Sequence, residues 1–175
     1  MGYSVHTWVV DGVLIAIVSL AALLDFKSQR IPNWLSFTGW YLGPVLHLLI
    51  SGAPALSGSV IGLLAVLVLT FPLFVLNWMG AGDVKLMASV GALVGIDHAL
   101  FFLTSIFIAG FVVAIIQLIL RGVFAAYVRR YWMMLGMSMA SGKPVYVEPA
   151  GTRQQVTMPY AISIAIGTLG ALCIT

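Results

Sequence analysis

Long apolar runs separated by short polar connections dominate the hydrophobic pattern of the chain. A membrane helix needs about 20 mainly apolar residues to cross the hydrocarbon core of a bilayer. Six runs approach this length, at about 5–24, 34–50, 56–78, 84–96, 98–120 and 158–174. The fourth run is short, and its separation from the fifth rests on Gly95, Asp97 and His98. The pattern predicts an all-α polytopic membrane protein with about six transmembrane helices.

The composition agrees with this fold class and excludes a soluble domain. Hydrophobic residues make up 62% of the 175 residues and charged residues only 7%, and the mean hydropathy is +1.12. Such a chain lacks the polar surface that keeps a globular domain in solution. The net charge of +3 does not indicate nucleic acid binding, because the few basic residues are scattered between apolar runs. We expect one transmembrane domain over 1–175.

The distribution of Lys and Arg predicts the orientation, since cytoplasmic connections carry an excess of these residues. With the N-terminus outside, the cytoplasmic connections are 25–33, 79–85 and 121–157. They contain every basic residue of the chain: Lys27, Arg30, Lys85, Arg121, Arg129, Arg130, Lys143 and Arg153. No Lys or Arg precedes the first run, so we interpret that run as a mature helix and not as a signal peptide. We expect a multi-pass protein of the cytoplasmic (inner) membrane with both termini outside.

The connection 121–157 has its own apolar pattern. Large apolar residues recur there at steps of three and four beside Arg129 and Arg130: Phe124, Tyr127, Val128, Tyr131, Trp132 and Leu135. This spacing predicts an amphipathic helix, either at the membrane surface or as an extension of the fifth run. Gly142, Pro144, Pro149 and Gly151 then indicate a loop. No internal repeat is evident, which gives an inverted-repeat transporter little support.

Acidic residues are rare, and each one near an apolar run needs a reason, because a carboxylate in a membrane is costly. Asp97 and Glu148 lie in connections, where a solvated charge is the simple interpretation. Asp11 lies near the outer end of the first run. Asp25 and Asp83 both lie at predicted cytoplasmic helix ends, so the topology places them at a similar membrane depth.

Asp25 and Asp83 each have a purely structural interpretation. Asp83 follows a glycine turn and is suited to cap a helix, while Asp25 resembles an interfacial charge beside Lys27 and Arg30. As a pair they suit peptide hydrolysis, because two close carboxyls share one proton. The charged member would activate a water, and the protonated member would polarise the scissile carbonyl. Their own helix ends suggest that Asp83 is the charged member and that Asp25 carries the proton.

Several segments resemble type IV prepilin peptidases, which are GxGD membrane aspartic peptidases. Gly80-Ala81-Gly82-Asp83 matches the GxGD motif, and Val84-Lys85-Leu86-Met87 continues it as in that family. Asp25 followed by Ile31-Pro32-Asn33-Trp34 resembles the first-aspartate segment, and 159–167 resembles the start of the last span. Presenilin-like proteins share GxGD but usually have Tyr before the first aspartate, where this chain has Leu24. Archaeal preflagellin peptidases are possible relatives.

The cysteine content separates two branches of the family that the chain resembles. The larger bifunctional enzymes carry an N-terminal four-cysteine zinc motif, associated with N-methylation. This chain contains only Cys173. It therefore resembles the small stand-alone form of Flp/Tad pilus systems, without the zinc and methyltransferase region.

The resemblance implies a leader peptidase with Asp25 and Asp83 as its catalytic residues. The implied substrates are prepilins or pseudopilins with a short, basic, cytoplasmic leader, cleaved after a glycine near the cytoplasmic membrane face. It implies no metal and no organic cofactor. The motif residues Gly80, Gly82, Lys85, Ile31, Pro32 and Asn33 are expected to support the site.

Two other functions are compatible with the same residues. One is a small transporter or channel that uses Asp25 and Asp83 as proton or ion ligands, and the other is a non-catalytic pilus or secretion assembly subunit. For Lys85, a membrane-anchoring charge and a group that tunes the site or binds substrate are both open. No nucleic acid partner is expected.

Overall fold

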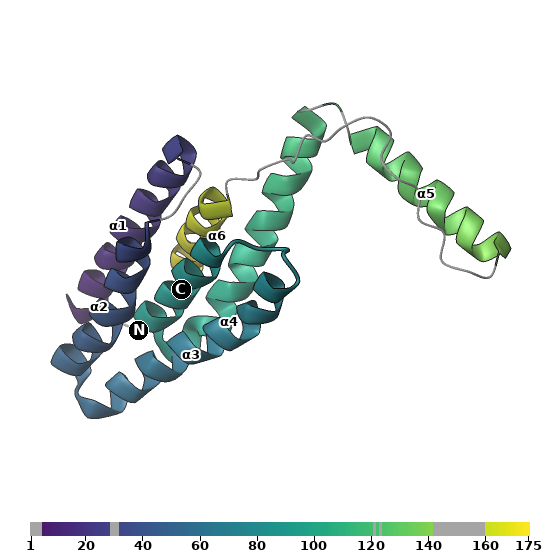
Figure 1. Cartoon of the computed structure of the whole chain (residues 1–175). Coiled ribbons are helices and arrows are strands. Elements are labelled where there is room, and N and C mark those ends of the chain that lie inside the picture. The colour runs from purple at the N-terminus through teal and green to yellow at the C-terminus, as the bar shows by residue number, and fades with distance from the viewer. Residues whose placement is uncertain (1–4, 29–31, 121, 123, 142–159) are drawn as a thin grey trace. The chain divides into compact units, whose positions relative to one another are not determined.

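The described residues of the computed structural model form six helices and no strand (Figure 1). It describes residues 5–28, 32–120, 122, 124–141 and 160–175. In chain order the helices are α1 (Val5–Ser28), α2 (Asn33–Ser51), α3 (Ala53–Val75), α4 (Ala81–Leu120), α5 (Phe124–Ser141) and α6 (Tyr160–Ile174). The predicted all-α class is confirmed. Helix α1 ends four residues later than predicted, so Asp25 lies in its last turn and not after its end.

Helix α4 contains a break at Gly95, where φ is 73° and ψ is 170°. This conformation is essentially restricted to glycine, because a Cβ would clash with the backbone. The break lies where the sequence pattern separated the fourth apolar run from the fifth. Helix α4 therefore consists of two helical segments, 81–94 and 96–120.

Three helices among the described residues are long and apolar enough to cross a membrane: Trp8–Ser28, Ala53–Val75 and Ala81–Leu120. Helix α6 is apolar but shorter. Large apolar side chains on these helices are exposed, including Leu23, Val68 and Phe111. This is expected where lipid and not water surrounds the helices. The chain is a membrane protein by these criteria, and the count of six crossings stays a prediction.

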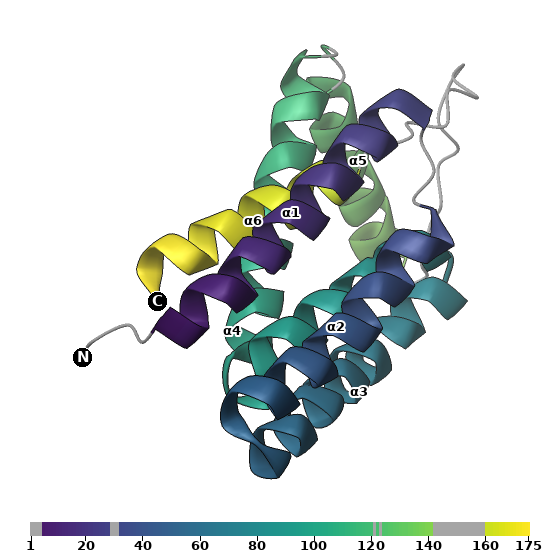
Figure 2. The ribbon, with the colours of Figure 1, turned by 90° about the vertical axis from the view of Figure 1, so that its left-hand side faces the viewer.

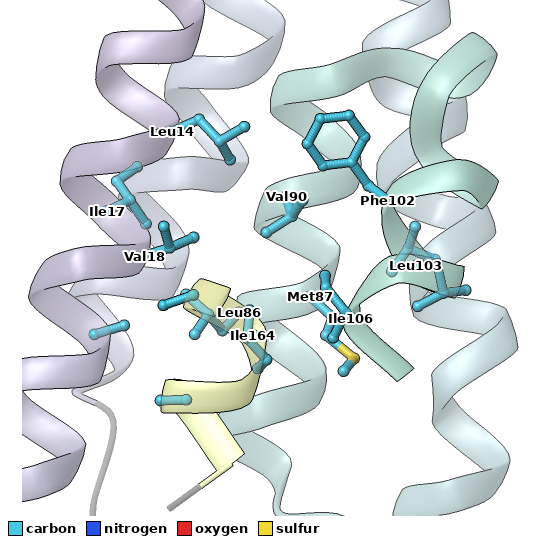
Figure 3. Close-up of a cluster of buried hydrophobic side chains, with 14 of the residues drawn as sticks. Leu14, Ile17, Val18, Leu86, Met87, Val90, Phe102, Leu103, Ile106 and Ile164 are labelled. Atoms are coloured by element: carbon cyan, nitrogen blue, oxygen red, sulfur yellow. The ribbon is translucent and has the colours of Figure 1, made fainter. Parts of the chain in front are cut away.

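The chain divides into two compact units, Met1–Gly110 with Pro159–Thr175, and Phe111–Met158. In the first unit α1 packs against α6, and α2 packs against α3 (Figure 2). The core lies between α1, α4 and α6, where Leu14 and Val18 of α1 face Leu86 of α4 and Ile164 of α6 (Figure 3). These four side chains are fully buried.

Small residues let helices of the first unit approach to backbone contact. A Cβ added at Gly62 of α3 would lie 2.5 Å from the Gly91 carbonyl oxygen of α4. Another at Gly43 of α2 would lie 2.7 Å from the Ala92 carbonyl oxygen, also in α4. The Ser59 hydroxyl of α3 donates to this same oxygen at 2.5 Å. The first segment of α4 is thus fastened to both α2 and α3, as small residues and hydroxyls fasten helices in membranes.

The second unit contains α5, so the predicted helix in the connection 121–157 is confirmed as a helix. Tyr131 and Trp132 in α5 are 68% and 71% exposed. Its place at a membrane surface stays a prediction. The predicted loop after α5, with Gly142, Pro144, Pro149 and Gly151, lies outside the described residues.

Candidate active site

The turn between α3 and α4 is formed by a helix cap at Asn77. Asn77 has a positive φ of 56°. Its N–H donates to the Phe74 carbonyl at 2.9 Å, and the Trp78 N–H donates to the Leu73 carbonyl at 2.9 Å. This pair of bonds is the Schellman motif, for which asparagine is suited because it tolerates a left-handed backbone. The cap ends α3 and directs the chain into the glycine turn that begins α4.

Asp83 is the third residue of α4 and is held by the turn that precedes it. The Gly80 backbone N–H donates a hydrogen bond to the Asp83 carboxyl, while the Asp83 N–H donates back to the Gly80 carbonyl at 3.1 Å. This reciprocal arrangement is a capping box in which aspartate takes the usual place of glutamate. A Cβ at Gly80 would lie 3.0 Å from Asp83 Oδ2. The first glycine of GxGD therefore leaves room for the carboxyl that it binds.

Asp25 is a buried carboxyl in the last turn of α1, with 7% of its surface exposed. The backbone N–H of Ala161, the second residue of α6, donates to Asp25 Oδ2 at 3.3 Å. The N–H groups in the first turn of a helix have no partner within the helix, and the positive end of the helix dipole attracts a carboxylate. Helix α6 thus supplies a binding partner to Asp25 from a distant part of the chain.

The structure brings Asp25 and Asp83 close enough for their carboxyls to interact electrostatically. Tyr160, the first residue of α6, also interacts electrostatically with Asp83. The phenol oxygen of Tyr160 would lie 3.1 Å from a Cβ added at Gly110 of α4. Three helix ends therefore meet at this site: the end of α1 and the beginnings of α4 and α6.

The assignment of the proton within the pair changes with this geometry. The sequence argument considered only the end of α1, which disfavours a charge on Asp25. The Ala161 N–H stabilises the charged form of Asp25, just as the Gly80 N–H stabilises that of Asp83. Helix ends therefore do not distinguish the two aspartates, and the prediction that Asp25 carries the proton loses its basis.

The supporting residues of the two predicted motifs are joined directly. Lys85 Nζ donates to Asn33 Oδ1 at 3.0 Å, although the two residues are 52 positions apart. Pro32 precedes the first residue of α2 and accepts a hydrogen bond from the Leu35 N–H. Gly82 is the second residue of α4. Ile31 lies outside the described residues.

The sequence interpretation missed the contribution of α6 to the site. The segment 159–167 was noted only for its resemblance, and nothing in a sequence marks one backbone N–H as a ligand for a carboxyl. Among the described residues, no group of three or more His, Cys, Asp or Glu could hold a metal ion. The chemistry available at this site is therefore that of two carboxyls held by backbone N–H groups beside a phenol.

Comparison with known families gives one match. The model of the type IV leader peptidase family matches residues 12–118, more than half of the chain. The match includes both aspartates and both motifs but not α6. No curated protein and no solved structure matches the chain. The chain therefore belongs to the type IV leader peptidase family and is by this membership a membrane peptidase.

Proposed function

We propose that this protein is an aspartic endopeptidase that removes the leader from type IV or Flp prepilin-like precursors, with Asp25 and Asp83 as catalytic residues. The observation that carries this proposal is the electrostatic contact between these two carboxyls, which are 58 positions apart in sequence. Each also accepts a backbone N–H, from Ala161 for Asp25 and from Gly80 for Asp83. Groups preorganised in this way do not have to reorient when the reaction begins.

The proposed reaction uses one proton shared between the two carboxyls. The carboxylate takes a proton from a water, and the resulting hydroxide attacks the scissile carbonyl. The protonated partner donates its proton to the carbonyl oxygen, which gives a neutral gem-diol. The C–N bond then breaks as the leaving amine takes a proton from the first carboxyl and the gem-diol returns one to the second. The pair ends as it began, with a single proton, so no metal is required.

The precursor would carry a short basic leader followed by an apolar helix, and cleavage would follow the leader glycine at the cytoplasmic face. Support for this side comes from the basic residues of the connections 25–33 and 79–85. A helical substrate cannot be hydrolysed while its carbonyls are bonded within the helix. A site at the helix ends of α1, α4 and α6 suits an extended leader just before the apolar helix begins.

Co-expression with a tagged precursor tests this function. We expect the wild type to shorten the precursor, and Asp25→Asn and Asp83→Asn to leave it intact. Asp11→Asn is the matched control, because it removes a carboxyl from the same helix α1 outside the site. An ion-coupled transporter predicts no cleavage by any variant, and an assembly subunit predicts unchanged processing when both aspartates are replaced. Either result would contradict the proposal.

A further inference from the structure

The hydrogen bond between Lys85 and Asn33 joins the two segments that carry the aspartates. Asn33 is the first residue of α2 and follows Asp25 by eight positions, and Lys85 follows Asp83 by two. We propose that Lys85 is a positioning residue, and that its clasp on Asn33 holds the Asp25 segment in register with the Asp83 segment. This inference rests on the function proposed above.

Lys85 lies along one face of α2. Its ammonium donates to Asn33 Oδ1 at 3.0 Å and lies 5.5 Å from the centre of the Phe37 ring. Its backbone carbonyl accepts a hydrogen bond from Trp40 Nε1 at 2.9 Å. Positions 33, 37 and 40 follow the four- and three-residue steps of one helix face. Both the side chain and the backbone of Lys85 are therefore fixed by α2.

The clasp acts where α2 is otherwise least constrained. Deeper in the bundle, the Ser89 hydroxyl of α4 donates to the Ser36 carbonyl of α2 at 2.7 Å, and Gly39 packs on Ser89. Asn33 is exposed and lies outside this seam, so Lys85 is the residue that holds it. Only 29–32 separate α1 from α2, and so short a connection transmits the position of Asn33 to the last turn of α1.

The chemistry of the clasp excludes a simple exchange of its members. Lysine has three donors and no acceptor, so its partner must be the amide oxygen of Asn33. Aspartate at position 33 keeps an acceptor for Lys85, and alanine removes it. Lys27 is an exposed cation in the last turn of α1 and provides a matched control for the loss of one positive charge near the same helix ends.

The test is a double-mutant cycle on the purified full-length protein in detergent, with a tagged prepilin-like precursor as substrate. We expect Lys85→Met and Asn33→Ala each to lower kcat about three- to tenfold with KM unchanged, the factor expected for one hydrogen bond. The double variant should be no slower than the slower single variant. Asn33→Asp should restore the rate, and Lys27→Met should leave it unchanged. Asn33→Ala serves alone if Lys85→Met does not accumulate in the membrane.

Three results would overturn the clasp. A raised KM for Lys85→Met with wild-type kinetics for Asn33→Ala would mean that Lys85 binds substrate. Equal losses for Lys85→Met and Lys27→Met would mean that only the charge matters. Independent, additive losses in the cycle would mean that the two residues do not act together. If instead Asp25→Asn and Asp83→Asn stay active in the same assay, the proposed function fails, and this inference fails with it.

Discussion

Replacement of Gly167 by alanine should separate α6 from α4 and so disturb Asp25. Gly167 lies where α6 meets α4, and an added Cβ would lie 2.8 Å from both Ile106 N and Ser105 O. Both atoms belong to the backbone, so no side-chain rotation relieves the contact. The helices must move apart until the distance reaches about 3.4 Å, the lower limit of ordinary contact.

The required movement is about 0.6 Å, from 2.8 Å to 3.4 Å. The Ala161 N–H already lies 3.3 Å from Asp25 Oδ2, near the upper limit for a hydrogen bond, and a shift of this size breaks it. Overpacking of a close helix contact costs about 1–3 kcal/mol of stability. Misplacement of a catalytic group by ångström-scale shifts lowers rates by up to about 100-fold, so we expect a loss of roughly tenfold or more.

Gly170→Ala is the matched control, because it lies three residues further along α6 and an added Cβ there meets nothing within 4 Å. Thermal unfolding in detergent and cleavage of a tagged precursor should be measured for both variants. We expect Gly167→Ala to lose stability and activity, and Gly170→Ala to retain both. Equal behaviour of the two variants would refute the argument that the α4–α6 contact positions Asp25.

Two further predictions follow from the glycines of α3 and of the α4 turn. Gly62→Ala should lower the unfolding temperature, because its Cβ meets the Gly91 carbonyl at 2.5 Å. Gly58→Ala, with its nearest atom at 3.9 Å, should leave that temperature unchanged or raise it, and the reverse order would contradict the helix packing. Gly80→Ala should lower kcat with little change in unfolding temperature, because its Cβ would lie 3.0 Å from Asp83 Oδ2 and displace only that side chain. Wild-type kinetics for Gly80→Ala would show that this contact does not position the carboxyl.

The sequence predicts the features that depend on local patterns. The apolar runs predict the helices, because the period and length of a membrane helix are imposed by the bilayer. The break in α4 follows from Gly95, which alone among the residue types adopts that backbone conformation readily. Asp25 and Asp83 stand out because carboxyls are costly and rare near membrane helices. The structure brings these two residues together, as the pair hypothesis requires.

Contacts between distant backbone and side-chain groups were beyond reach from the sequence. Every helix has free N–H groups in its first turn, so no residue type identifies Ala161 as the donor to Asp25. Lys85 was explained as a membrane anchor or a substrate-binding group, since its spacing from Asp83 excludes a direct pair on one helix face. Its partner Asn33 lies on another helix, and only the packing of α2 on α4 brings them together.

The central claim is that hydrolysis requires both aspartates, and the cleavage rate of a tagged prepilin-like precursor tests it most directly. Purified wild type, Asp25→Asn and Asp83→Asn should be compared at equal concentration, after their unfolding temperatures are shown to agree. We predict cleavage by the wild type and a loss of at least about 100-fold in each variant, because each carboxyl transfers a proton in the reaction. Cleavage at a rate near that of the wild type by either variant would contradict the two-aspartate mechanism.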